Sequence, residues 1–186
     1  MGSLSTNHSA HVWAALVLIL WTVGITCVFH DWKVQLALFA WGGLGVFAGW
    51  WDIRTKRLPN WLTALNAAVS MGLGVLVGES ASDALVGAIS GVLAVLIVKL
   101  LAELITGVHS IGMGDVKLMF SLGVFTGLSG ISILLGLSAL LSLPYSLYAK
   151  RHSASQTIPF GPFLVAGAMG AVILNTLTNS QVAMYF

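Results

Sequence analysis

Long apolar runs, separated by short polar or charged stretches, dominate this 186-residue sequence. Hydrophobic residues make up 58% of the chain and charged residues only 8%, whereas a soluble domain carries about 25% charged residues. So few charges cannot supply the hydrated surface that a cytosolic enzyme, a nucleic-acid-binding protein or a disordered segment needs. The sequence therefore predicts a protein that lies in the lipid bilayer and has no nucleic acid as a partner.

Seven apolar runs bounded by charged or turn residues predict helices. They cover residues 12–29, 34–51, 61–77, 84–105, 116–127, 131–148 and 160–176. The connections around residues 30–33 and 128–130 are tight, which favours antiparallel helices on either side of each. We expect an all-α polytopic membrane protein, a bundle of six core transmembrane helices plus one extra N-terminal helix. Residues 1–32 would form an N-terminal segment and residues 33–186 one membrane domain.

The fifth predicted helix, residues 116–127, is too short to cross a bilayer by itself. At 1.5 Å per residue it covers roughly 18 Å, against a hydrocarbon core of about 30 Å. Either the loop before it dips into the membrane, or the turn at residues 127–130 is submerged. Irregular backbone at that depth has to be surrounded by protein or by a water-filled cavity. Both alternatives predict a pocket near residues 110–116.

Basic residues gather in loops that fall on one side of the predicted bundle. These residues are Arg54, Lys56, Arg57, Lys117, Lys150 and Arg151. Lys33 falls on the opposite side. Because Lys and Arg near span ends accumulate on the cytoplasmic side of a membrane, we expect a cytoplasmic N-terminus and a periplasmic or extracellular C-terminus.

The acidic residues fall into three groups by their place along the chain. Asp31, Glu79 and Asp83 lie in short loops on the outer side, where water solvates them. Lys99 and Glu103 stand four residues apart on one helix, a spacing that predicts a structural ion pair. A supporting role beside the pocket is the alternative for this pair. The third group is Asp52 and Asp115.

Asp52 and Asp115 map to the same cytoplasmic edge of the predicted bundle. Asp52 ends the second helix, and Asp115 begins the fifth directly after Gly112 and Gly114. These glycines leave room for an extended peptide, although an Asp at a helix start also suits the helix dipole. Helix cap and active site therefore both stay open for Asp115 on this evidence.

Two facing carboxylates have a specific chemical use. Repulsion keeps one protonated while the other ionises, so one can act as a base toward water and the other as an acid toward a carbonyl. No serine triad, phosphate loop or metal cluster competes with this pair in the sequence, and of the five histidines only His109 lies near Asp115. We expect hydrolysis by such a pair to fall at both extremes of pH.

Three segments carry recognisable motifs. Residues 52–60 read DIRTKRLPN, an Asp followed by a basic stretch and a Pro-Asn ending. Residues 112–118 read GMGDVKL, and residues 158–163 read IPFGPF at the start of the last predicted helix. In this order and spacing they resemble the prepilin peptidases, bacterial membrane aspartic endopeptidases with a GxGD motif.

This resemblance implies that Asp52 and Asp115 are the catalytic pair of an endopeptidase without metal or other cofactor. The implied partners are the lipid bilayer and type IV pilin-like precursors, whose short basic leader would be cleaved at the cytoplasmic face of the inner membrane. The residues implied to bind substrate or shape the site are Gly112, Gly114, Lys117, Pro159 and Gly161. Lys117 would bias the charge of the pair or contact a lipid headgroup, and Pro159 would cap its helix or line the pocket.

The chain departs from the larger bifunctional members of this family, which also methylate the new N-terminus through a region with paired cysteines. It has no such region and only Cys27, so we expect neither methyltransferase activity nor zinc. The helix at residues 12–29 is an addition to the usual set. Two alternatives stay open: a catalytically inactive relative in pilus or secretion-system assembly, and a small membrane transporter, since buried carboxylates also build permeation sites.

Overall fold

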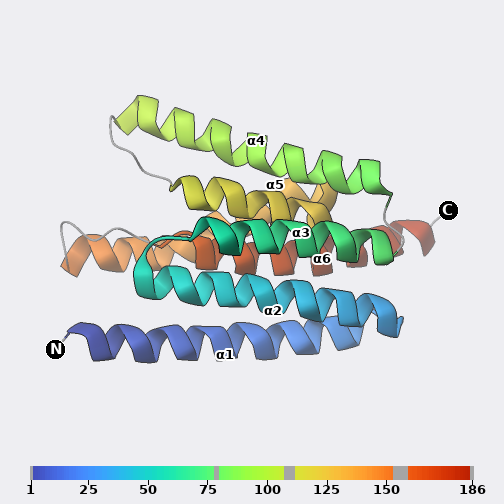
Figure 1. Cartoon of the computed structure of the whole chain (residues 1–186), viewed down its shortest axis with the longest axis horizontal. Coiled ribbons are helices and arrows are strands. Elements are labelled where there is room, and N and C mark those ends of the chain that lie inside the picture. Colours follow the sequence, from blue (N-terminus) through green and yellow to red (C-terminus); the bar gives the residue numbers. More distant parts are fainter. Residues whose placement is uncertain (1, 78–79, 107–111, 153–158, 185–186) are drawn as a thin grey trace.

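The computed structural model is a bundle of helices, which confirms the predicted all-α class (Figure 1). It describes residues 2–77, 80–106, 112–152 and 159–184, so Glu79 and His109 lie outside the described residues. The helices are α1 (Gly2–Val28), α2 (Trp32–Thr55), α3 (Asn60–Leu76), α4 (Ala81–Thr106), α5 (Met113–His152) and α6 (Gly161–Met184). Among the described residues, five helices are long and apolar enough to cross a membrane, and α3 is shorter. The chain is therefore a multi-pass membrane protein.

The first tight connection lies where it was predicted, between α1 and α2. Asp31 caps the start of α2, because its side chain accepts the backbone N–H of Lys33 at 2.9 Å. Asp31 therefore has a structural task beyond the loop polarity that the sequence suggested.

Helix α5 contains the two helices predicted at residues 116–127 and 131–148. They meet at Gly127, whose φ of 61° and ψ of 179° interrupt the helix; glycine adopts this φ without strain. Asp115, near the start of α5, and Tyr145, near its end, both lie beside the start of α6, against Gly161 and Phe163. The two halves of α5 therefore run in opposite directions, and the chain turns at Gly127, the first residue of the turn predicted at residues 127–130.

Glycines bring α4 and the first half of α5 into close contact. A methyl group at Gly87 would overlap the carbonyl oxygen of Gly123, and one at Gly91 would lie 3.1 Å from the carbonyl oxygen of Met119. Small residues at such positions let helix backbones approach closely in a membrane. The first half of α5 consequently lies along α4 and within its length (Figure 1).

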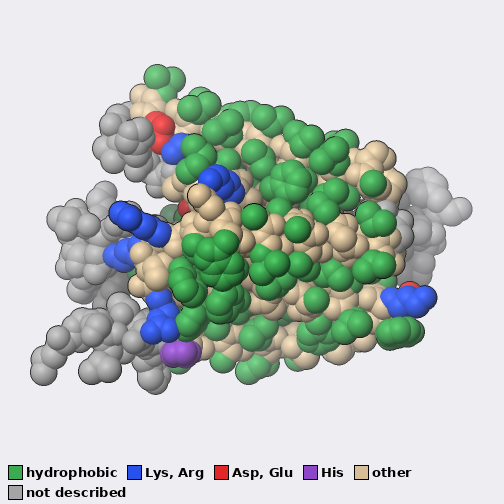
Figure 2. Space-filling view, viewed as in Figure 1, with side chains coloured by type: hydrophobic (Ala, Val, Ile, Leu, Met, Phe, Trp, Pro, Cys, Tyr) green, Lys and Arg blue, Asp and Glu red, His purple; other side chains and the backbone are tan. Residues whose placement is uncertain are grey.

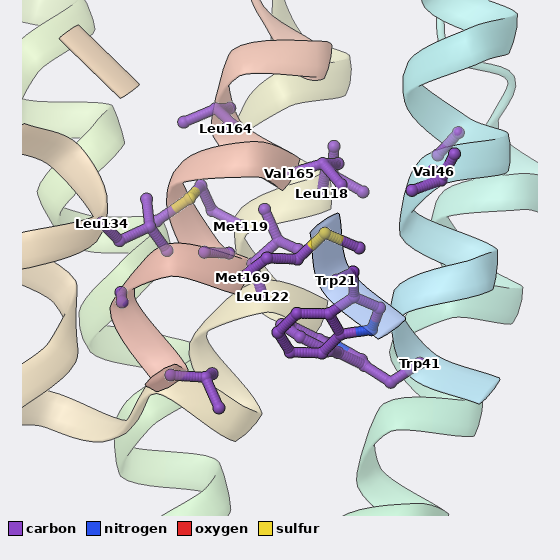
Figure 3. Close-up of a cluster of buried hydrophobic side chains, with 14 of the residues drawn as sticks. Trp21, Trp41, Val46, Leu118, Met119, Leu122, Leu134, Leu164, Val165 and Met169 are labelled. Atoms are coloured by element: carbon purple, nitrogen blue, oxygen red, sulfur yellow. The ribbon is translucent and has the colours of Figure 1, made fainter. Parts of the chain in front are cut away.

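Two tryptophans join three helices in the core (Figure 3). The indole N–H of Trp21 in α1 donates to the Leu38 carbonyl in α2 at 3.1 Å. That of Trp41 in α2 donates to the Ser121 carbonyl in α5 at 3.2 Å. Because hydrocarbon offers no alternative partner for an N–H group, these bonds fix the register of α1 against α2 and of α2 against α5.

Charge is unevenly distributed along the bundle. Figure 2 shows several Lys and Arg side chains at one end of the visible face and a smaller charged group at the other. The predicted ion pair on α4 is confirmed, since Lys99 Nζ lies 2.9 Å from Glu103 Oε1.

Candidate active site

The two aspartates come from distant parts of the chain and meet beside the start of α6. Asp52 lies in the last turn of α2 and Asp115 in the first turn of α5. A methyl group at Gly161 would lie 2.9 Å from Asp52 Oδ2 and 3.4 Å from Asp115 Oδ1. One oxygen of each carboxylate therefore reaches the same small region, where a single water molecule can touch both.

Both carboxylates are buried. Asp52 is 6% exposed and Asp115 is 7% exposed. The charges of the two groups repel one another, and the Lys99 ammonium lies close enough to attract Asp115. A buried pair of carboxylates is most stable when it shares one proton, because two adjacent negative charges in an apolar site are costly. This is the protonation state that general acid–base hydrolysis needs.

The third motif contributes a hydrogen-bond donor to the pair. The backbone N–H of Gly161 donates to Asp52 Oδ2 at 3.2 Å. Glycine is needed there because any side chain would push into the space between the two carboxylates. The following residue, Pro162, packs against Gly49 of α2, where a methyl group would lie 3.2 Å from its Cα. The start of α6 is thus held against the turn of α2 that precedes Asp52.

The two glycines of the GxGD motif differ in what they do. The backbone N–H of Asp115 donates to the Gly112 carbonyl at 3.1 Å, which closes the first turn of α5. A methyl group at Gly114 would lie 2.9 Å from Leu58 Cβ. Gly114 therefore lets the connection between α2 and α3 lie directly against the start of α5.

That connection also fixes the end of α2. Lys56 adopts the left-handed conformation, with φ 53°, and its N–H donates to the Asp52 carbonyl at 2.7 Å. The Thr55 hydroxyl donates to the Arg57 carbonyl at 2.8 Å. Together these bonds stop the helix three residues after Asp52 and turn the chain toward α3.

Lys117 has a partner that the sequence did not suggest. Its ammonium donates to Asn60 Oδ1 at 2.8 Å and so joins the start of α5 to the start of α3. Asn60 is the residue of this candidate site that the sequence did not predict, and the Pro-Asn ending of the first motif was the available signal. An effect of Lys117 on the charge of the pair, or a headgroup contact, stays a prediction.

Pro159 lies half-buried ahead of Phe160, whose carbonyl accepts the N–H groups of Phe163 and Leu164. This position at the helix start suits the capping alternative, and its part in lining the pocket stays a prediction. The predicted pocket near residues 110–116 lies partly outside the described residues. The described cavity next to it is lined by residues that include Asn60, Val116 and Lys117.

Aromatic residues form a belt at the same end of the bundle. The rings of Trp50, Trp51 and Trp61 form successive T-shaped contacts, and the Arg54 guanidinium sits 4.6 Å from the centre of the Trp50 ring. Tryptophans with this arrangement are typical of the membrane interface. In the part of the chain that the structure describes, no group of three or more His, Cys, Asp or Glu side chains is placed to hold a metal ion.

The chain is similar to known proteins over the segment that contains both aspartates. A family model described as the type IV leader peptidase family matches residues 36–147, which include both aspartates. The chain is 35% identical over 161 residues to a protein of Xanthomonas campestris named prepilin leader peptidase/N-methyltransferase. It is 34% identical over 131 residues to a protein of that name from Burkholderia pseudomallei, and 32% identical over 132 residues to one from Pectobacterium carotovorum.

These matches cover 77%, 67% and 67% of this chain but only 53%, 42% and 46% of the respective relatives. The chain thus spans about half the length of the curated relatives it matches. Helix α1 lies outside the residues that the family model matches. No solved structure matches the chain.

Proposed function

This chain belongs to the type IV leader peptidase family, and we propose that it is a membrane aspartic endopeptidase that removes the leader from type IV prepilin-like precursors. The observation that carries the proposal is the convergence of Asp52 and Asp115 on Gly161. The names of the relatives support the substrate class.

In the proposed reaction the pair holds one proton, and the ionised carboxylate takes a proton from a water molecule. The resulting oxygen attacks the scissile carbonyl carbon while the protonated carboxyl gives its proton to the carbonyl oxygen. The tetrahedral intermediate, a gem-diol, then collapses as the protonated carboxyl gives its proton to the leaving amide nitrogen and the ionised carboxylate takes a proton from one hydroxyl of the diol. The C–N bond breaks, and the pair again holds one proton. The N–H of Gly161 keeps Asp52 oriented throughout this cycle.

We place the enzyme in the bacterial inner membrane, with the aspartates and the N-terminus at the cytoplasmic face and the C-terminus on the other side. The basic residues support this orientation, because Arg54, Lys56 and Arg57 follow Asp52 directly. We also assign residues 33–186 to the peptidase domain and residues 1–32 to an added segment. The start of the family match at residue 36 supports this division.

The test is a cleavage assay in membranes with a prepilin-like precursor, in which leader loss is followed by mass. We expect Asp52→Asn and Asp115→Asn each to lower the rate at least about 100-fold, because asparagine cannot carry the proton cycle. Asp83→Asn is the matched control, since Asp83 is exposed in the first turn of α4. The wild-type rate should also fall at both extremes of pH.

Cleavage by either active-site variant at the wild-type rate would overturn the assignment of the pair. If the wild type fails against several precursors, the chain is an inactive relative or a transporter, and proton flux into liposomes separates those two.

A further inference from the structure

Helices α3, α4 and α5 enclose a groove of about 610 Å³ beside the aspartate pair. Its lining on α5 is Val116, Lys117 and Phe120, and the first two directly follow Asp115. The groove therefore begins one residue from the site of the proposed chemistry. This continuity distinguishes it from an ordinary gap between membrane helices.

The groove opens sideways, toward the region that lipid occupies. Helix α4 packs on α5 through Gly87 and Gly91, but it diverges from α3 and α5 toward the end of the bundle that holds the aspartates (Figure 1). On α4 Val92 lines the groove, and the side chains of Leu93 and Ile97, one and five residues later, are exposed. A molecule within the bilayer can thus reach the groove without passing through water.

The lining changes from polar to apolar along the groove. Its polar end is the hydrogen-bonded pair of Asn60 and Lys117. Farther along, α3 contributes Ala64, Ala67 and Thr63, whose hydroxyl donates to the Asn60 carbonyl, and α4 contributes Val92. A polypeptide that fits this groove has an extended segment with free backbone polar groups at the polar end, near the aspartates, and an apolar helix along the apolar part. The helix is needed there because exposed backbone groups are costly in hydrocarbon.

The interface between α1 and α2, on the other side of Asp52, is already filled. Trp13 of α1 covers Gly49, three residues before Asp52, where a methyl group would lie 2.5 Å from its ring. Trp21 covers Gly42 in the same way. A second helix therefore finds no room between α1 and α2, whereas the alanine side chains of α3 permit close approach beside α4.

We propose that this groove is the docking site for an apolar helix that follows the scissile bond of the precursor. The proposal rests on the proposed function, because it takes the leader-bearing precursor as substrate. With the helix in the groove, its first residues pass Lys117 and Asn60 and lie beside Asp115. A second N–H of the Lys117 ammonium then donates to a backbone carbonyl of the substrate and holds the scissile bond beside Asp52 and Asp115.

Disulfide cross-linking tests the docking directly. In an Asp115→Asn, Cys27→Ser background, single cysteines replace Ala64 or Ala68, two exposed alanines on α3. Ala64 lines the groove, whereas Ala68 is outside its lining. A precursor with one cysteine in its apolar helix should cross-link at least about tenfold faster to position 64 than to position 68, because the cross-linking rate follows the occupancy of the groove. Equal rates at both positions would overturn the proposal.

Filling the groove provides a second readout. Ala64→Phe should raise the KM for the full precursor about tenfold and leave cleavage of a short peptide without the apolar helix unchanged. Ala68→Phe should behave like the wild type with both substrates. If Ala64→Phe and Ala68→Phe cleave the precursor equally well, the groove is not the docking site, while cleavage by the wild type still upholds the proposed function.

The two experiments separate the possible failures. Cross-linking at position 64 without cleavage by the enzyme that retains Asp115 would support the docking site and overturn the proposed function. A photoactivatable phospholipid that labels position 64, with no precursor cross-link there, would identify the occupant as lipid and overturn the proposal.

Discussion

The interface between α1 and α2 and the α3–α4 side of this bundle use small residues to opposite effect. On the α1 side, Gly42 and Gly49 of α2 are covered by the rings of Trp21 and Trp13. On the other side, Ala64 and Ala67 of α3 line a groove of about 610 Å³. A small side chain closes an interface when a large ring from a neighbouring helix reaches it, and it leaves an opening when that neighbour diverges.

The aspartate pair lies between these two sides. Asp52 belongs to the helix that α1 covers, and Asp115 belongs to the helix that borders the groove. Gly161 of α6 touches both. The closed side thus provides a rigid support for one carboxylate, and the open side leads to the other. The following variants test each part of this contrast.

The largest effect is expected where α4 meets α5. Gly87→Leu places a bulky side chain against the backbone of Gly123, and the two helices must separate. We expect no folded protein in detergent, measured by monodisperse yield in size-exclusion chromatography. Gly136→Leu is the control, because its position on α5 has open space. A folded Gly87→Leu protein would contradict close packing of α4 on α5.

The closed side is tested by Trp21→Ala. Trp21 is 2% exposed and its N–H is bonded to the Leu38 carbonyl, so its loss should cost about 3–5 kcal/mol of unfolding free energy. Thermal unfolding in detergent measures this. Trp32→Ala should have little effect, since Trp32 is 67% exposed. Equal melting temperatures for the two variants would mean that α1 does not support the bundle.

Gly161→Ala tests the point between the carboxylates. The added methyl group would displace Asp52 Oδ2, at 2.9 Å, and a misplacement of this size lowers the rate of cleavage about 100-fold. The melting temperature should change little. Gly170→Ala, also on α6, meets only the end of the Leu137 side chain and should cleave normally. Full activity of Gly161→Ala would place the reacting groups elsewhere.

The smallest effect is expected at the polar end of the groove. Asn60→Ala removes the acceptor of Lys117. The lost hydrogen bond contributes about 1 kcal/mol, so kcat/KM for the precursor should fall roughly fivefold. Asn60→Asp keeps an acceptor and should restore most of the activity. If Asn60→Asp is as impaired as Asn60→Ala, the hydrogen bond to Lys117 does not hold the site together.

Much of the fold follows from local sequence. Apolar runs predicted the helices, and the i, i+4 spacing predicted the ion pair of Lys99 and Glu103. The turn inside α5 was predicted at residues 127–130, where several neighbouring residues have turn character, and within this range Gly127 takes the positive φ. Helix α5 also begins at Met113, so the predicted start at residue 116 was three residues late.

The site was harder to predict, because contacts between distant segments define it. The motifs identified Asp52 and Asp115, but the N–H of Gly161 reaches Asp52 across 109 positions of sequence. Likewise, the bond between Lys117 and Asn60 depends on how α3 packs beside α5. Local spacing carries no information about either contact, which is why Lys117 was expected near the pair or at a headgroup.

The central claim is that Asp52 and Asp115 act as one unit. The most direct measurement is the rate of leader loss from a prepilin-like precursor for Asp52→Asn, Asp115→Asn and the double variant at equal abundance in membranes. Residues that act as a unit are strongly non-additive, so we predict that each single variant loses as much activity as the double variant. Additive losses, or a single variant that cleaves at the wild-type rate, would contradict the shared site.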